Sequence, residues 1–193
     1  MINLILFGPP GSGKGTQADF IVQRNMLTHI STGDIFRKNI SQKTELGKLA
    51  NDYMKKGQLV PDQLTINLLE SELNLFKNTN GFIFDGFPRT IPQADAFDIL
   101  LKNKKMSLSF VISLEVSENE LVKRLLNRGI DSGREDDQNE EVVRNRIRVY
   151  QQQTSVLKKY YLDNLKDAFI SINGEREIVE ISNDISNILF QNK

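Results

Sequence analysis

A short apolar run that leads directly into a glycine-rich loop is the feature of this sequence that most constrains its fold. Ile2–Phe7 has the length and composition of a buried strand, the loop Gly8–Thr16 follows at once, and Gln17–Arg24 then has a helical pattern. A strand, a glycine loop and a helix start in this order point backbone N–H groups and the positive helix end at one spot. Phosphate oxygens are the natural ligand there, so we expect an α/β protein that binds a phosphorylated molecule.

The loop has the spacing of a P-loop, in which two glycines separated by four residues, here Gly8 and Gly13, precede a lysine. We expect Lys14 to reach the outer phosphates, and Thr16 to reach a phosphate or a magnesium-bound water. Gly15 stands where the general motif has Ser or Thr, and this departure bears on metal binding. A glycine-rich turn without a ligand is the alternative interpretation.

Further apolar runs alternate with helical patterns along the chain. Phe82–Phe84 and Ser109–Leu114 are predicted strands, and Thr28–Ile30 and Phe169–Ile172 are weaker candidates. This alternation predicts a P-loop NTPase-type fold, a parallel sheet with helices on both faces. The helical patterns are carried by Leu64, Leu68, Leu69 and Leu73, by Leu121, Val122, Leu125 and Leu126, and by Ile178, Ile181, Ile185, Ile188 and Leu189.

Composition limits the number of domains and the kinds of partner. With 193 residues, 39% of them hydrophobic, the chain can bury one sizeable core, and we expect a single domain without repeats. Lys and Arg together number 25, as do Asp and Glu, so no overall charge draws the protein to nucleic acid or to a membrane surface. Any basic patch must be local.

Cysteine and histidine are nearly absent, which restricts metal chemistry. The chain has no cysteine, which excludes disulfides and thiolate metal sites, and the single histidine, His29, is interpreted as structural. The N-terminal apolar run is too short for a secretion signal, and no stretch approaches the roughly 20 apolar residues of a membrane span. We therefore expect a cytoplasmic protein.

The predicted strand Phe82–Phe84 ends in a carboxylate, Asp85. In P-loop enzymes an acid at such a position holds magnesium, directly or through water. Alternatively, Asp85 forms a turn or caps a helix before Gly86 and Pro88.

Two segments are the least core-like parts of the chain. Residues 31–60 have few bulky apolar side chains and are expected to form a small helical flap with little burial of its own. The second segment is a predicted loop, Gly129–Gly133, which precedes a long polar helical stretch from about Glu140 to about Leu165. Weakly buried elements open at low free-energy cost, so both segments are candidates for motion.

Several glycine-containing and polar segments follow one another in a fixed order between the first strand and the last helix. They are Thr28–Asp34 with Arg37, Gly57–Asp62, Asp85–Arg89 with Gln93, Ser132–Arg134 with Asp136 and Asp137, and Arg146. Together with the P-loop, this set resembles the adenylate kinase family of nucleoside monophosphate kinases. The resemblance implies reversible phosphoryl transfer from Mg²⁺-bound ATP to AMP, giving two ADP, by a monomer. It also implies an NMP-binding flap at 31–60 and a short lid at 129–135, on a core of 1–30, 61–128 and 136–193.

The resemblance also implies a role for individual residues. Those expected to bind ATP are Gly11, Ser12, Gly13, Lys14, Gly15, Thr16, Arg128 and the backbone near Arg176. Those expected to bind AMP are Thr32, Arg37, Gln58, Leu59, Val60, Gly86, Phe87, Pro88, Arg89 and Gln93. Arg134 and Arg146 would contact the phosphates of both substrates.

A catalytic role is expected for Lys14, Arg89, Arg128, Arg134 and Arg146. A phosphoryl group in transfer spreads negative charge over its equatorial oxygens, and planar guanidinium groups match it with paired hydrogen bonds. Asp34 and Asp85 are expected to orient magnesium-bound waters, because the acceptor phosphate is already an oxyanion and needs no base. For any single arginine the alternative is a solvated helix face, the interpretation we adopt for Arg24, Arg144 and Arg148.

Two departures from the family pattern are visible. The segment between Arg134 and Arg146 is one residue longer than the common pattern, which leaves Arg144 as a possible substitute; the spacing of Arg146 to Tyr150 favours Arg146. The loop after Arg128 is short and lacks zinc-ligand cysteines, so the chain resembles the short-lid members and no structural zinc is expected.

Two other functions remain open at the level of sequence. A UMP/CMP kinase would keep almost every phosphate contact and change the base pocket, where Thr32 and Gln93 are the residues that favour AMP. A nucleotide-dependent switch or binding module would also use a P-loop and Asp85. Guanine-specific switches usually carry Asn-Lys-x-Asp, however, and the nearest string here, Asn103–Met106, lacks the acid.

Overall fold

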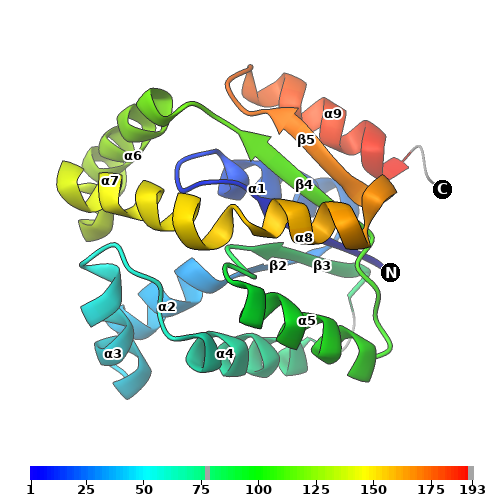
Figure 1. The fold of residues 1–193 in the computed structure, drawn as a ribbon, viewed down its shortest axis with the longest axis horizontal. Coiled ribbons are helices and arrows are strands. Elements are labelled where there is room, and N and C mark those ends of the chain that lie inside the picture. Colours follow the sequence, from blue (N-terminus) through cyan, green and yellow to red (C-terminus); the bar gives the residue numbers. More distant parts are fainter. Residues whose placement is uncertain (77–78, 191–193) are drawn as a thin grey trace.

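A five-stranded parallel sheet forms the centre of the computed structural model, which describes residues 1–76 and 79–190 (Figure 1). The strand order is β2-β3-β1-β4-β5, which matches the predicted α/β sheet. The strands are β1 (Ile2–Phe7), β2 (Thr28–Ser31), β3 (Gly81–Asp85), β4 (Phe110–Glu115) and β5 (Phe169–Asn173), so all five predicted strands are present.

Helices cover both faces of this sheet (Figure 1). In the described part of the chain they are α1 (Lys14–Asn25), α2 (Thr32–Ser41), α3 (Glu45–Met54), α4 (Asp62–Leu75), α5 (Ile91–Asn103), α6 (Glu118–Ser132), α7 (Glu140–Val149), α8 (Leu157–Asn164) and α9 (Ile178–Phe190). Short 3₁₀ turns lie at Glu135–Asp137 and Lys166–Ala168, and a π turn at Tyr150–Thr154 joins α7 to α8.

The central strand β1 supplies apolar side chains to two separate cores. Ile5 and Phe7 pack into a cluster with residues of α4, α5 and α8, on one face of the sheet. Leu4 and Leu6 pack into a second cluster with residues of α1 and α9, on the other face. Burial of an apolar side chain of this size stabilises the fold by roughly 1.5–3 kcal/mol. A strand that is covered on both faces buries all of its side chains, so a continuous apolar run is a reliable signal for such a strand.

The helical segment expected at 31–60 consists of α2 and α3. These helices cross so closely that a Cβ on Gly47 would lie 2.1 Å from the carbonyl oxygen of Asn39. Phe36, Ala50 and Val60 form a small cluster that is completed by Leu68 of α4. The segment therefore has a small apolar core, and this core also attaches it to α4.

The predicted loop Gly129–Gly133 is wrong, because α6 continues through Ser132 and ends at Gly133 in the left-handed conformation, with φ of 66°. Gly129 serves close packing instead: a Cβ there would lie 2.6 Å from the carbonyl oxygen of Asp137. The polar stretch predicted from about Glu140 to about Leu165 is helical, but the π turn Tyr150–Thr154 interrupts it.

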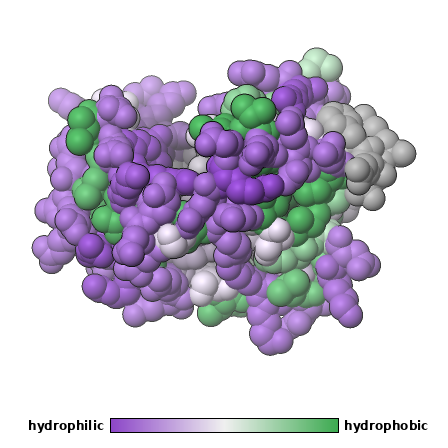
Figure 2. Space-filling view, turned by 90° about the horizontal axis from the view of Figure 1, so that it is seen from above, coloured by the Kyte–Doolittle hydropathy of each residue, from purple (hydrophilic) through white to green (hydrophobic). Residues whose placement is uncertain are grey.

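The sheet brings two loops of different origin to one edge. β1 and β3 are parallel neighbours, with Leu6 opposite Asp85, so the loops that follow them start side by side at the carboxyl ends of the strands. Crevices at this edge are where open α/β sheets bind ligands. The face seen in Figure 2 is mainly hydrophilic and is hollowed between two lobes. In the described part of the chain, no helix is both long and apolar enough to cross a membrane.

Candidate active site

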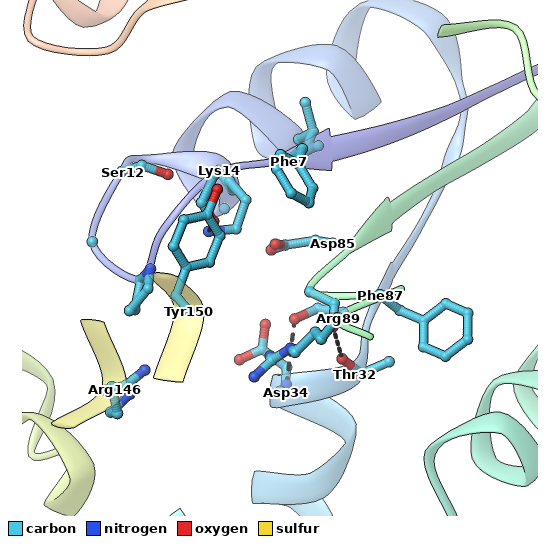
Figure 3. Close-up of a pocket in the computed structure, with 18 of the residues that line it drawn as sticks. Phe7, Ser12, Lys14, Thr32, Asp34, Asp85, Phe87, Arg89, Arg146 and Tyr150 are labelled. Carbon is cyan, nitrogen blue, oxygen red and sulfur yellow. Dashed lines mark hydrogen bonds between the residues drawn. The ribbon is translucent and has the colours of Figure 1, made fainter. Parts of the chain in front are cut away.

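A cavity of about 690 Å³ opens at the carboxyl ends of β1 and β3 (Figure 3). All the side chains and backbone segments assigned from the sequence to ATP, AMP or magnesium line it. They are Gly11, Ser12, Gly13, Lys14, Gly15, Thr16, Thr32, Asp34, Arg37, Gln58, Leu59, Val60, Asp85, Gly86, Phe87, Pro88, Arg89, Gln93, Arg128, Arg134, Arg146 and Arg176. Residues as far apart in sequence as Gly11 and Arg176 therefore share one site.

The glycine-rich loop curls around the ammonium group of Lys14. Gly11 and Gly13 have φ of 86° and 96°, values that other residues rarely adopt. Lys14 Nζ donates hydrogen bonds to the carbonyl oxygens of Gly8, at 2.8 Å, and Pro9, at 2.9 Å. Burial lowers the pKa of Lys14 to about 8, partly offset by the charge of Asp85. A buried cation bonded mainly to carbonyl oxygens is well suited to an incoming anion.

Four buried polar atoms on the cavity wall have no hydrogen-bond partner among the described residues: Ser12 Oγ, Gln17 Oε1, His29 Nε2 and Tyr150 Oη. His29 Nε2 faces Asp85 Oδ2 at 3.5 Å. Buried polar atoms are normally hydrogen-bonded, so the other three fit a ligand rich in polar groups. Ser12 lies in the glycine-rich loop, and Tyr150 extends from its helical turn toward that loop (Figure 3).

Arg89, like Lys14, is a deeply buried cation. Its Nε donates to the carbonyl oxygen of Gly86 at 2.6 Å, and Thr32 Oγ1 donates to the same oxygen at 2.9 Å. Gly86 has φ of 73°, and a Cβ there would lie 2.7 Å from the Arg89 guanidinium, so the position requires glycine. Burial and the neighbouring charge of Arg146 lower the pKa of Arg89 to about 10, which leaves it charged at neutral pH.

Two predicted AMP-binding residues have their side chains engaged by the protein. Phe87 is 1% exposed and packs edge-on against Phe97 in the core, so only its backbone faces the cavity. Gln93 Oε1 accepts from the Arg89 N–H at 2.8 Å, and its Nε2 donates to Asp62 at 2.7 Å. A contact between Gln93 and a nucleotide base would have to exchange or share one of these bonds.

Four further arginines reach the cavity. Arg37 lies on α2, Arg128 on α6 and Arg146 on α7, and Arg134 lies between α6 and α7. Arg37 and Arg134 both donate to Asp34 Oδ1, at 2.5 Å and 3.2 Å, which joins the flap to the residue after α6. Arg128 donates to Asp137 through two nitrogens, at 2.7 Å and 3.1 Å, and Arg146 also donates to Asp137. Burial alone would raise the pKa of Asp137, but these two guanidinium groups hold it below its usual range.

The structure distinguishes Arg146 from Arg144. Arg146 lines the cavity with a side chain that is 18% exposed. Arg144 lies outside the cavity, is 48% exposed, and pairs with Glu140 and Glu118 on the surface. Of the two arginines, Arg146 is the one that lines this cavity, and its contact with phosphate stays a prediction.

Asp85 is the carboxylate best placed to serve a metal ion carried by a nucleotide. Burial would raise its pKa, but His29 and Lys14 lower it, so the group stays ionised. The distance from His29 Nε2 to Asp85 Oδ2 is 3.5 Å, a charge contact rather than a well-formed hydrogen bond. Burial alone would lower the pKa of His29, and the proximity of Asp85 raises it instead.

The oxygen atoms of the cavity suit a magnesium ion that arrives bound to the nucleotide, and not one held by the protein alone. Within the described ranges, no group of three or more His, Cys, Asp or Glu residues could hold a metal by itself. Asp34 already accepts from two arginines at one oxygen, so Asp85 and the Thr16 hydroxyl are the freer oxygen donors. Oxygen ligands of this kind, supplemented by water and phosphate, are what Mg²⁺ prefers.

Comparison of the chain with known proteins shows the family to which it belongs. Residues 6–166 match the model of a family described as "Adenylate kinase". The chain belongs to the adenylate kinase family. It is 51% identical over 189 residues to an adenylate kinase of Flavobacterium psychrophilum, with 98% of each chain covered. It is 49% identical over 185 residues to an adenylate kinase of Bacteroides fragilis, with 96% of each covered, and 46% identical over 189 residues to one of Flavobacterium johnsoniae, with 98% covered.

Membership of the adenylate kinase family confirms that the chain is an enzyme with a nucleotide-binding P-loop. The expected resemblance, fold class and kinase activity are thereby confirmed, and a nucleotide-dependent switch is not favoured. The family assignment leaves open which cavity residue performs which step.

Among the cavity residues to which the sequence analysis gave no role are Arg124, Tyr150 and Thr154. Arg124 donates to the carbonyl oxygen of Gly174 at 2.9 Å, which ties α6 to the segment after β5. It lies four residues before Arg128, on the same face of α6, and that spacing was the available signal. Arg176 lines the cavity, and its guanidinium group pairs with Asp184.

Proposed function

We propose that this protein transfers the terminal phosphoryl group of ATP to AMP, reversibly, giving two molecules of ADP. The observation that carries the proposal is the single cavity in which the Lys14 loop and Arg89 face each other from the ends of adjacent strands. One wall suits the phosphates of a donor nucleotide and the other suits those of an acceptor. Membership of the adenylate kinase family supports the same pairing of substrates.

AMP is the proposed acceptor in preference to UMP or CMP. The relatives described above carry the name adenylate kinase, and at about half identity over nearly the whole chain they favour the adenine nucleotide. Thr32 and Gln93 are the residues proposed to select the base. Gln93 would have to exchange or share one of its present hydrogen bonds to do so.

On the donor side, Gly11 to Thr16 are proposed to hold the ATP phosphates through backbone N–H groups and the Lys14 ammonium. Binding of the phosphates favours the charged form of Lys14, whose pKa burial has lowered to about 8. Arg128 and the backbone near Arg176 are proposed to complete the ATP site. The Arg124 side chain is close enough to Gly174 to shape the same wall.

On the acceptor side, Arg37 and Arg89 are proposed to bind the phosphate of AMP, with Gln58 to Val60 and Gly86 to Pro88 around the nucleoside. An oxygen of that phosphate attacks the γ-phosphorus of ATP, and the bond between this phosphorus and the bridging oxygen to the β-phosphate breaks. Lys14, Arg89, Arg128, Arg134 and Arg146 stabilise the charge on the transferring group. Arginines in this role contribute roughly 10³–10⁵ in rate elsewhere, about 4–7 kcal/mol of barrier.

Magnesium bound to ATP would neutralise charge on the phosphates and align the reacting oxygens. Asp85 and Asp34 are proposed to hold its waters, with Asp85 the stronger candidate because its oxygens are not bonded to arginine. No structural zinc is proposed.

Two mobile parts are proposed to close over the substrates: residues 31–60 as the AMP flap and residues 129–135 as a short lid. Support comes from their meeting across the cavity, where Asp34 of the flap binds Arg134 of the lid. Closure excludes water, which would otherwise accept the phosphoryl group. We further propose a monomeric protein of the cytoplasm.

A coupled assay of ADP formation from ATP with AMP, UMP, CMP or GMP tests the proposed reaction. We expect AMP to be the best acceptor, and preference for a pyrimidine nucleotide would overturn the choice.

Arg89→Ala tests the acceptor site within the same assay. We expect kcat/KM for AMP to fall by roughly 10³-fold while the affinity for ATP changes little, because Arg89 lies on the acceptor wall. Arg144→Ala is the matched control, since Arg144 lies outside the cavity, and it should behave like the wild type. Equal losses for the two substrates in Arg89→Ala would contradict the assignment.

A further inference from the structure

We propose that Thr154 is a positioning residue that sets the direction of Arg89 through a hydrogen bond to its backbone. The inference rests on the proposed transfer to AMP. Thr154 Oγ1 donates to the carbonyl oxygen of Arg89 at 2.8 Å, across 65 positions of sequence. The Thr154 residue is 5% exposed and lines the cavity, so little water competes for this bond.

A local irregularity of the backbone brings the Thr154 hydroxyl to this place. Residues 150–154 form a π turn, in which the N–H of Ser155 donates to the carbonyl oxygen of Tyr150 at 2.8 Å, five residues earlier. A wide turn inside a long helix is less favourable than a regular turn and is frequent at functional sites. Here it lies where the helical stretch that carries Arg146 passes the loop that carries Arg89.

Arg89 is held at both ends of its backbone and at its side chain. Its N–H donates to Gln93 Oε1, its carbonyl oxygen accepts from Thr154, and its Nε donates to the carbonyl oxygen of Gly86. Gln93 and Thr154 are both buried, which fixes the peptide groups on either side of the Arg89 Cα. These three hydrogen bonds together hold the guanidinium group in place beside Gly86, on the acceptor side of the cavity.

Without the Thr154 bond, the Arg89 carbonyl loses its only hydroxyl donor among the described residues. The peptide that follows Arg89 could then rotate, and the guanidinium group would spend less time in the orientation that binds the acceptor phosphate. The donor loop around Lys14 has its own hydrogen bonds and does not depend on this contact.

Thr154→Val tests the inference because valine keeps the shape of threonine and removes the hydroxyl. We expect kcat/KM for AMP to fall about tenfold, the usual effect of losing one buried hydrogen bond, with KM for ATP within about twofold of wild type. Thr154→Ser keeps the hydroxyl and should restore most of the activity toward AMP. Thr154→Ala gives the same comparison against serine if the valine variant does not fold.

Thr28→Val is the matched control. It removes the hydroxyl of Thr28, which donates to Thr79 Oγ1 at 2.9 Å away from the cavity. It should lower thermal stability without changing the ratio of the two KM values. Equal kinetic changes in Thr28→Val and Thr154→Val, or failure of serine to restore AMP use, would overturn the proposal.

A double-mutant cycle with Arg89→Ala separates positioning from general stability. If Thr154 acts through the Arg89 side chain, Thr154→Val should change kcat/KM for AMP less than about twofold in the Arg89→Ala background. A full tenfold loss in that background would refute the inference. Failure of the wild-type protein to form ADP from AMP would refute the proposed function itself, so the two failures are distinguishable.

Discussion

The surroundings of Lys14 disfavour the charged form of its side chain. The side chain is buried, two backbone carbonyl oxygens hold its ammonium group, and Asp85 is the main negative group that supports it. Its pKa is lowered to about 8, whereas an ordinary lysine has a value of about 10.4. The free protein therefore holds a cation that loses its proton within the range of pH where enzymes are assayed.

This lowered pKa predicts the pH dependence of ATP use. Because the pKa of Lys14 lies below its ordinary value, the charged form is lost as pH rises through about 8, and ATP phosphates bind the charged form. We expect kcat/KM for ATP to be level near pH 7 and to fall about tenfold per pH unit well above 8. Steady-state rates at limiting ATP and saturating AMP measure it.

Lys14→Arg provides the control for the pH profile. Arginine stays protonated in this range, so the fall above pH 8 should disappear or move upward even if overall activity is lower. A descending limb at the same pH in both proteins would show that another group titrates.

At the scale of elements, the 3₁₀ turn Glu135–Asp137 links α6 to α7 through one carboxylate. The side chain of Asp137 is 0% exposed and accepts from Arg128 of α6 and Arg146 of α7. Both arginines are partly exposed, so the group is less isolated than a fully buried ion pair. The turn nevertheless depends on this carboxylate for the relative position of the two helices.

Asp137→Asn should destabilise the protein by about 1–3 kcal/mol, because asparagine leaves at least one guanidinium with a weaker partner. The pKa of Asp137 is depressed, so its contribution is present above about pH 4 and is lost as pH falls through the depressed native value. Urea denaturation at pH 7 and below pH 4 measures both effects. Asp163→Asn, which removes an exposed pair with Lys159, should change stability by less than about 0.5 kcal/mol.

The strands were predictable from sequence, whereas the irregular helical elements were not. A continuous apolar run such as Ile2–Phe7 buries all of its side chains when it forms a strand in a sheet that is covered on both faces. In the sequence Gly129 indicates a loop, but in the structure it marks close packing against Asp137, a contact that only the tertiary structure reveals. The π turn was also hidden, because apolar and small residues at spacings of three and four continue through it, at Val143, Ile147, Tyr150, Thr154, Leu157 and Tyr161.

The same limit applies to the site. The residues assigned to nucleotides could be named because the family pattern fixes their order, and the spacing of Arg146 to Tyr150 in that pattern favoured Arg146 over Arg144; all of the assigned residues line the cavity. Hydrogen bonds through backbone atoms, such as that between Thr154 and Arg89, have no sequence signature. The engagement of Gln93 with Asp62 was also invisible, because these two side chains, 31 positions apart in sequence, meet only in the tertiary structure.

At the scale of the whole molecule, the two proposed moving parts meet over the cavity. Asp34 binds Arg134, Lys55 lies 3.5 Å from Glu135, and Asn145 of α7 donates to the carbonyl oxygen of Lys56 at 2.6 Å. These contacts lie mostly on exposed side chains, each of which contributes little by itself, about 0–1 kcal/mol. The arrangement is suited to opening and closing in each catalytic cycle.

Shortening either part should admit water to the transferring phosphoryl group. We expect a variant in which residues 42–57 are replaced by a short Gly-Ser linker to hydrolyse ATP faster relative to transfer, and a shortened 129–135 segment to do the same. Phosphate release without AMP and ADP formation with AMP give the ratio. Arg89→Ala is the comparison, since it impairs transfer while leaving both parts in place; an unchanged ratio in the shortened variants would contradict the role in excluding water.

The adjacency of β1 and β3 has a consequence for protein engineering. The donor loop and Arg89 are anchored to neighbouring strands whose register pairs Leu6 with Asp85, whereas α6 reaches Gly133 at the periphery. Chimeras that insert a longer or metal-stapled lid after Gly133 should therefore keep the donor loop and Arg89 in their present relative positions. The effect of lid size then falls on Arg134 and on the exclusion of water, and can be varied without redesigning the two strands.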